Sequence, residues 1–150
     1  MVEQVVFTNM CMIADGCRVL VQNRVDKNWG GYVFPGGHVE KGETFCQSVI
    51  REVFEETGLT ISKPVLCGIK HWQGKGDVRN VVLLYKTTEF SGSLKSSDEG
   101  EVFWMDLSEL QSSDKFADSF DSMLKVFLDD NLSEHTWLIG ASKDWQEIVE

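Results

Sequence analysis

Basic residues are scarce in this chain of 150 residues. Its 14 lysines and arginines stand against 24 aspartates and glutamates, which gives a formal net charge of −10 at pH 7. A surface this acidic repels polyanions unless a local patch or a bound metal reverses the field, so we expect no nucleic acid polymer as a partner. A small phosphorylated ligand that arrives with divalent cations remains compatible with this charge.

Cysteine is sparse as well, and the cysteines that are present do not cluster. Cys11, Cys17, Cys46 and Cys67 form no CxxC pair and lie in apolar-looking segments. Their spacing argues against a zinc site and against a disulfide framework. We expect reduced thiols.

Long apolar runs, repeats and low-complexity tracts are all absent. No run approaches the ~18 apolar residues of a membrane span, and residues 1–4 lack the basic segment that opens a secretory signal. We therefore expect no membrane partner and a cytoplasmic location. With no linker in sight, we expect one domain over residues 1–150, and a chain of this length buries roughly 68–70% of its unfolded surface.

Apolar and β-branched residues predict a series of strands. Residues 5–13 are apolar at both even and odd positions, which predicts a strand covered on both faces. Asp15-Gly16 predicts a tight turn into a second strand over residues 18–23. We expect further extended segments at residues 32–34, 65–72, 78–85 and 102–105, and polar turns at residues 91–93, 96–100 and 108–110.

Two helices are predicted, far apart in the chain. The first begins at Thr44, which forms a capping box with Gln47, and ends at Gly58, a residue suited to a left-handed C-cap. Its buried face is expected to comprise Cys46, Val49, Ile50 and Val53. The second spans residues 120–128, and the chain from Asn131 onward receives no assignment. Strands interleaved with two helices predict an α/β fold, an α/β/α sandwich with a mixed sheet between the helices.

An acidic cluster dominates the first helix. Glu52, Glu55 and Glu56 fall on one face at helical spacing, where like charges repel by a few tenths of a kcal/mol per pair. A solvated acidic face, partly neutralised by Arg51, is the simplest explanation of such a cluster. A hard cation such as Mg²⁺ is the alternative, favoured by the preceding Gly36-Gly37 loop, which permits close backbone approach and can offer a carbonyl ligand.

The spacing around this cluster resembles the Nudix box, and the match covers residues 37–59. Each defined position is present: Gly37, Glu43, Arg51, Glu52, Val53, Glu55, Glu56, Gly58 and Leu59. The resemblance, and the similar order of strands and terminal helix in MutT-like members, implies hydrolysis of a nucleoside diphosphate linked to another group. It also implies Mg²⁺, or Mn²⁺, as the cofactor.

Site residues are carried over on the same resemblance. Glu52, Glu55, Glu56 and Gly37 would hold the metal, and Glu52 or a later glutamate would activate the water. Arg51 and Glu43 would brace one another and orient the helix carboxylates. The chemistry is consistent with these residue types, because phosphoryl transfer requires positioning and neutralisation of developing charge.

Four further residues are nominated outside the box. Glu99, which precedes Trp104 in a polar loop, resembles a later metal-proximal glutamate of the family, although a turn residue is an equal alternative. Arg24 would meet a phosphate, with an exposed surface arginine as its alternative. Phe116 and Asp118 resemble the aromatic residue and the acid that oxidised-purine triphosphatases set against the base. The chain departs from those relatives at Val33, where they have asparagine, and at Phe116-Ala117, where they have tryptophan-proline.

Three functions stay open at this point. The first is a Mg²⁺-dependent nucleoside triphosphate pyrophosphohydrolase that acts on a small-molecule substrate of the 8-oxo-dGTP type. The second is cleavage of ADP-ribose or a dinucleoside polyphosphate at the same site. The third is a catalytically silent nucleotide-binding module, against which the intact Glu52, Glu55 and Glu56 argue. The sequence leaves monomer and homodimer both open.

Overall fold

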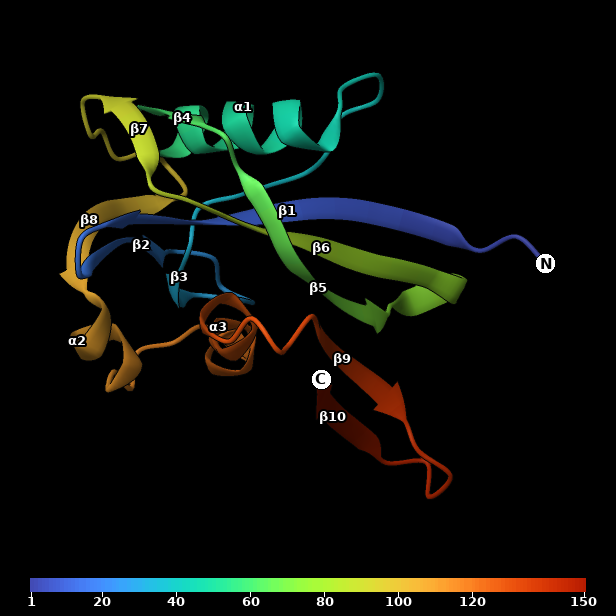
Figure 1. The fold of residues 1–150 in the computed structure, drawn as a ribbon. Helices are drawn as coiled ribbons and strands as arrows, with labels where there is room; N and C mark the ends of the chain where they lie inside the picture. The colour runs from blue at the N-terminus through green and yellow to red at the C-terminus, as the bar shows by residue number, and fades with distance from the viewer.

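A twisted mixed sheet forms the middle layer of the structure, a computed structural model that describes residues 1–150 (Figure 1). Its strands run in the order β10-β9-β5-β6-β1-β2-β3, and β8 pairs with β2. The pairs β1–β6 and β5–β9 are parallel, and the others are antiparallel. The strands are β1 (Gln4–Asp15), β2 (Arg18–Arg24), β3 (Gly31–Val33), β5 (Val65–Gln73), β6 (Val78–Thr87), β8 (Gly100–Asp106), β9 (Glu134–Ile139) and β10 (Trp145–Val149).

Helices cover both faces of this sheet. In Figure 1, α1 (Phe45–Thr57) lies on one side, while α2 (Leu107–Gln111) and α3 (Phe120–Leu128) lie on the other. A second, two-stranded sheet joins β4 (Leu59–Ser62) to β7 (Glu89–Gly92), and a short 3₁₀ helix, η1 (Lys75–Asp77), connects β5 and β6. The α/β/α sandwich predicted from the sequence is confirmed. No helix is both long and apolar enough to cross a membrane.

Alternate side chains of the strands feed two cores, one under each helix layer. On the α3 side, Val82 and Leu84 pack with Phe120 and Phe127 of the helix. On the α1 side, the intervening Leu83 packs with Val49 and Val53, among others. The period of two that strand geometry imposes therefore divides one apolar sequence between two layers.

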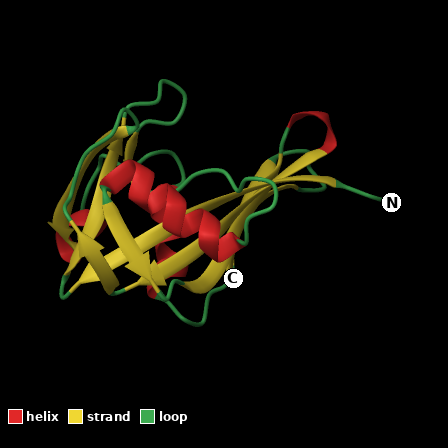
Figure 2. Cartoon of the chain, turned by 90° about the horizontal axis from the view of Figure 1, so that it is seen from above, coloured by secondary structure: helices red, strands yellow, loops and turns green.

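The N-terminal end of β1 departs from the prediction. The strand begins at Gln4, but Val5, Val6 and Phe7 remain 37–38% exposed, so it is covered on both faces only from its middle onward. Figure 2 shows why, because the N-terminal strand extends past the end of α1. The expectation of full coverage was wrong for these residues.

The caps of α1 match the prediction. Thr44 accepts a hydrogen bond from the Gln47 amide at 3.1 Å, and the Gln47 side chain accepts one from the Thr44 amide at 2.8 Å. Gly58 is left-handed at φ 76° and donates to the Phe54 carbonyl. Such caps fix where the helix begins and ends, and an N-cap of this kind contributes about 1 kcal/mol.

The buried face of α1 is shifted from the one expected. Cys46 is exposed and Ile50 is only half-buried, whereas Ser48 and Glu56 are buried. The Ser48 hydroxyl accepts from Asn9 at 2.8 Å and donates to the His38 carbonyl at 3.3 Å. These hydrogen bonds centre the contact stripe on Val49, Val53 and Glu56 and leave Cys46 at its edge.

Several elements were not predicted. β7 was missed because it includes polar residues 91–92, which were expected to form a turn, and its partner β4 was missed with it. Residues 107–111 form a short helix where a turn was expected, and the unassigned tail forms the β9–β10 hairpin. β9 is held by parallel pairing with β5 from Ile69 to Trp72, a contact between distant parts of the chain.

Candidate active site

The glycine loop between β3 and α1 is pinned against β1. The Asn9 amide donates to the Gly37 carbonyl at 2.8 Å, and the Asn9 side-chain oxygen accepts from the Gly37 amide at 3.2 Å. A Cβ at Gly36 would lie 2.0 Å from the Asn9 carbonyl oxygen, so only glycine permits this approach. The loop is thereby fixed beside the carboxylates of α1.

Glu52 projects from α1 onto this loop. A Cβ at Gly37 would lie 2.3 Å from Glu52 Oε2, so the carboxylate occupies the space that the missing side chain leaves. Glu52 Oε1 accepts from Arg51 Nη1 at 2.8 Å. Burial raises the pKa of Glu52, while the hydrogen bond from Arg51 opposes that rise.

Glu56 is the most buried carboxylate of the helix, with 5% of its surface exposed. Its Oε2 accepts from the Gly36 amide at 3.0 Å and from Gln22 Nε2 at 3.3 Å. Burial raises its pKa to about 7, with the nearby charges of Glu52 and Glu99 adding to the effect. Both donors are neutral, so no side-chain cation within ion-pair distance compensates the charge of ionised Glu56.

Arg51 makes the contact with Glu43 that the sequence predicted. Its Nε and Nη2 donate to the two Glu43 oxygens at 3.1 and 2.7 Å, and Nη2 also donates to the His38 carbonyl at 2.9 Å. These bonds lower the pKa of Glu43 to about 2. Through Nη1 the same guanidinium bonds Glu52, so Arg51 ties the loop before the helix to the carboxylate within it.

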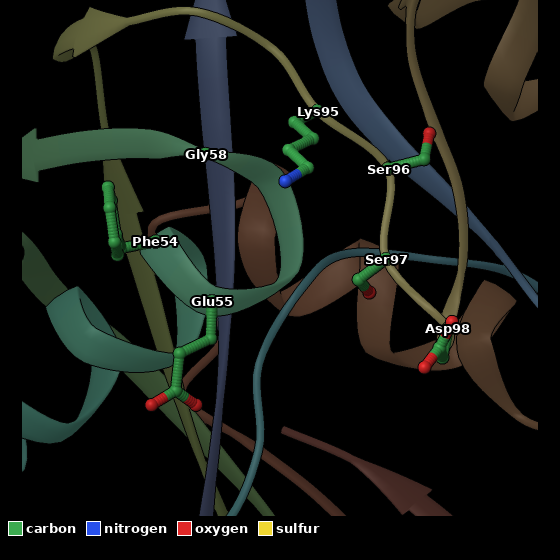
Figure 3. Close-up of a pocket in the computed structure, with 7 residues that line it drawn as sticks. All are labelled: Phe54, Glu55, Gly58, Lys95, Ser96, Ser97 and Asp98. Atoms are coloured by element: carbon green, nitrogen blue, oxygen red, sulfur yellow. The ribbon is translucent and has the colours of Figure 1, made fainter.

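Glu55 is the most exposed of the three helix carboxylates. Its side chain is 54% exposed and accepts from Arg51 Nη1 at 3.2 Å. It lines an open pocket of about 420 Å³ with Phe54, Gly58 and residues 95–98. Figure 3 shows Phe54, Glu55 and Lys95 pointing in different directions, so this pocket does not gather converging groups.

The acidic residues do not form a preassembled metal cage. No three histidine, cysteine, aspartate or glutamate side chains converge closely enough to hold an ion. Glu52 and Glu56 nevertheless each keep one carboxylate oxygen, Oε2 and Oε1 respectively, that accepts no hydrogen bond. Together with a loop carbonyl they form an all-oxygen donor set of the kind that Mg²⁺ or Mn²⁺ accepts, so these residues fit a hard divalent cation.

The two glycine carbonyls of the loop differ in their hydrogen bonds. The Gly37 carbonyl accepts the Asn9 amide at 2.8 Å, whereas the Gly36 carbonyl accepts no backbone or side-chain hydrogen bond. A carbonyl that accepts one hydrogen bond keeps a second lone pair, so the role of Gly37 as a metal ligand stays a prediction, and Gly36 is a further candidate. The sequence motif could not distinguish two adjacent glycines. Their different hydrogen bonds depend on how β1 pairs with the loop.

Metal binding is expected to weaken by about tenfold per pH unit below pH 7, because Glu56 must release a proton before it can bind a cation. The pKa of Glu56 is raised from 4.5 to about 7, so in the metal-free protein its contribution to the unfolding free energy falls as the pH rises through that range. Calorimetric titration with Mn²⁺ between about pH 6 and 8, a range centred on this pKa, measures how the affinity for the metal changes with pH. Glu56→Gln should bind weakly with a flat pH profile, and a steep profile in that variant would assign the proton elsewhere.

Arg24 and Glu99 lie next to each other, and both are near Glu56. Arg24 Nη1 lies 3.6 Å from Glu99 Oε2, and the guanidinium stacks 5.5 Å from the centre of the Trp29 ring. Arg24 Nε is buried and has no hydrogen-bond partner. The two residues nominated from sequence are therefore neighbours, and Glu99 is close enough to raise the pKa of Glu56.

The structure separates Phe116 from Asp118. The Phe116 ring packs 5.6 Å from that of Phe120 and lines a small pocket on α3 with Leu124 and Leu128. Asp118 is exposed, and its carbonyl accepts from Trp29 Nε1 at 2.8 Å. Phe116 thus has a packing partner already, while the Asp118 carboxylate has no hydrogen-bond donor.

Two site residues escaped the sequence reasoning. Asn9 and Gln22 are 3% and 1% exposed, and they hold the Gly37 amide and Glu56 respectively. Each is a polar residue inside an otherwise apolar strand. A buried polar side chain requires a hydrogen-bond partner, so this interruption was the available signal.

The family of the chain follows from its match to known sequences. A family model described as NUDIX domain matches residues 5–127, most of the chain. The chain therefore belongs to the Nudix family.

Relatives with different activities resemble the chain to a similar degree. It is 31% identical over 107 residues to the uncharacterized Nudix hydrolase YvcI of Bacillus subtilis, with 68% of this chain and 66% of the relative covered. It is 31% identical over 91 residues to an oxidized purine nucleoside triphosphate hydrolase of Danio rerio (60% and 56% covered) and 30% identical over 114 residues to an ADP-ribose pyrophosphatase of Methanocaldococcus jannaschii (73% and 64% covered). The chain spans 56 to 66% of the length of these relatives.

A solved structure extends the likeness over nearly the whole chain. The crystal structure of a MutT protein from Bacillus halodurans matches with a TM-score of 0.79 and 27% identity, and the match covers 97% of both chains. The chain is thus a MutT-like member of the family.

Proposed function

We propose that the chain hydrolyses a nucleoside triphosphate to a nucleoside monophosphate and pyrophosphate, with oxidised purines of the 8-oxo-dGTP type as substrates. The observation that carries the proposal is the convergence of Glu52 and Glu56 on the glycine loop, where each keeps a free carboxylate oxygen. Similarity to an oxidized purine nucleoside triphosphate hydrolase supports the choice of substrate.

The roles assigned to the residues follow from their contacts. Glu52, Glu56 and a loop carbonyl would hold Mg²⁺ or Mn²⁺, with Glu55 available from the helix surface. A cation bound there would supply charge neutralisation for the diphosphate. Arg51 holds Glu52 in place through its bonds to Glu43 and the His38 carbonyl.

Two further groups complete the proposed site. Glu52 or Glu99 would accept the proton of the attacking water. The Glu52 carboxylate lies against the glycine loop, and the Glu99 carboxylate lies near Glu56. The Arg24 guanidinium, half-buried next to Glu99, would bind a substrate phosphate. In the absence of substrate, Glu99 compensates part of its charge.

A second candidate is cleavage of ADP-ribose or a dinucleoside polyphosphate at the same carboxylates. It is favoured by the similarity to an ADP-ribose pyrophosphatase, which covers 73% of this chain. A catalytically silent nucleotide-binding module is the non-enzymatic candidate. Glu56 argues against it, since burying a carboxylate without a counter-charge costs stability that a retired site has no reason to bear.

A nucleotide panel tests these candidates directly. The protein would be incubated with 8-oxo-dGTP, the ordinary triphosphates, ADP-ribose and a dinucleoside polyphosphate, with Mg²⁺ or Mn²⁺, and the products separated by ion exchange. We expect pyrophosphate and a nucleoside monophosphate, with 8-oxo-dGTP cleaved most efficiently. Release of orthophosphate alone contradicts the proposed products, and preferential cleavage of ADP-ribose selects the second candidate.

A further inference from the structure

Lys70 is a buried lysine without a partner. It lies in the middle of β5, is 7% exposed, and forms no hydrogen bond or ion pair with any other residue. Its Nζ lies 5.4 Å from the centre of the Trp72 ring, within the range of a cation–π contact. The Lys70 side chain is largely desolvated, but its Nζ is not sealed from solvent, so a ligand from outside the chain can reach the ammonium and compensate its charge.

Three carboxylates outside β5 face this lysine without forming an ion pair with it. They are Asp118 before α3, Asp121 in its first turn and Glu147 on β10. Burial lowers the pKa of Lys70, and these three charges oppose the shift. Beside Lys70 in the sheet, the fully buried His135 bonds Glu147 at 2.8 Å through Nε2, while its Nδ1 has no partner.

This cluster lies within a nucleotide's reach of the glycine loop. The segment that carries Asp118 is bound along β3, where the Tyr32 amide donates to the Lys115 carbonyl at 2.7 Å and the Ala117 amide donates to the Tyr32 carbonyl at 3.2 Å. β3 leads directly into the loop, and the extended chain from Tyr32 to Gly36 spans at most about 13 Å. A nucleotide whose phosphates lie at Gly36 can therefore extend its base along β3 to the segment of Asp118, whose carboxylate is one of the three that face Lys70.

We propose that Lys70 recognises the substrate base by donating a hydrogen bond to the oxygen at C6 of a purine, an inference that rests on the proposed function. An ammonium offers three donors and no acceptor, so it matches the acceptor edge of a guanine-type base. Adenine presents an amino donor at the same position and leaves the lysine unpaired. The acceptor-only carboxylate of Asp118 complements the N–H groups of a guanine-type base.

The selectivity of a Lys70→Met variant tests this assignment. Methionine keeps the length of the side chain and removes its donors. We expect kcat/KM for 8-oxo-dGTP and dGTP to fall about 10- to 100-fold while that for dATP is unchanged or rises, since one good pairing to a base edge discriminates to about this extent. Lys63→Met, at a lysine on the surface that bonds Glu89, is the matched control and should keep wild-type selectivity. An unchanged ratio of 6-oxo to 6-amino substrates in Lys70→Met overturns the proposal.

Thermal unfolding distinguishes recognition from a structural role. Removing an unpaired buried charge should leave Tm unchanged or raise it, whereas loss of Tm together with unchanged selectivity would make Lys70 a structural residue. Should the methionine variant fail to fold, Lys70→Gln carries the same comparison. Its amide can donate to a 6-oxo base or accept from a 6-amino base, so this variant should lose most of the preference.

Direct binding separates this inference from the proposed reaction. Calorimetry with dGMP and dAMP requires no turnover, and we expect the wild type to bind dGMP more tightly and Lys70→Met to bind both alike. If the wild type cleaves no triphosphate yet shows this pattern, the proposed reaction fails and the role of Lys70 stands. Equal binding of dGMP and dAMP by the wild type overturns the role of Lys70 whatever the panel of substrates shows.

Discussion

Glu52→Gln is expected to lower kcat by about 10²- to 10⁴-fold, the range for loss of a positioned acid–base or charge-stabilising group. Glutamine keeps the shape of the side chain but removes the charge from the oxygen that faces Gly37. The loop and the caps of α1 do not depend on that charge, so Tm should stay close to the wild-type value. Single-turnover hydrolysis of 8-oxo-dGTP and a thermal melt measure the two effects.

The matched control for this variant is Glu109→Gln, at an exposed glutamate on α2 far along the chain from the box. It should retain wild-type kcat. Turnover in Glu52→Gln equal to that of the control would remove Glu52 from the catalytic assignment, and a large loss of Tm would mean that the charge is structural instead.

Arg51→Met should have the second largest effect, and it should act on both turnover and folding. The guanidinium bonds Glu43, Glu52 and Glu55, so its loss leaves three carboxylates close together without a cation. We expect kcat to fall about 10²-fold, since a misplaced catalytic group costs roughly that much. Arg51→Lys should restore the positive charge but not the forked geometry of the guanidinium, so its kcat should lie between those of the wild type and Arg51→Met.

Acid stability provides an independent readout of Arg51. The pKa of Glu43 is lowered from 4.5 to about 2, chiefly by its hydrogen bonds with Arg51. A lowered carboxylate pKa contributes stability that is present above about pH 4.5 and is lost as the pH falls toward 2. Arg51→Met should lose this part of the pH dependence, as measured by urea unfolding at pH 7 and at lower pH. A variant with wild-type turnover and acid profile would show that Arg51 does not position Glu52.

Local signals in the sequence were sufficient for α1 and its caps. The bonds of Thr44, Gln47 and Gly58 involve residues at most four positions apart, so their spacing determines them. The pairing of Arg51 with Glu43 was predicted from the motif and is present. The catalytic roles of the box residues stay predictions.

Contacts between distant segments account for what the sequence did not reveal. Which of the Gly36 and Gly37 carbonyls accepts a hydrogen bond depends on the backbone amide of Asn9, which lies 28 residues before Gly37. The burial of Ser48 in place of Cys46 has the same origin. Lys70 gave no signal at all, because a lysine in an apolar strand is usually assigned to the solvent side, and its burial depends on distant segments that pack against β5, among them α3 and β9.

The β9–β10 hairpin has a consequence for how the molecule behaves in concentrated solution. Residues 134–149 lie beyond the part of the chain that the family model matches, and β9 covers the backbone of β5 from Ile69 to Trp72. An uncovered β5 would present a row of free N–H and C=O groups, a template on which other chains can add strands. With the hairpin in place, the outermost strand is β10, which is only five residues long and carries the charged Glu147. The hairpin therefore shields an aggregation-prone edge.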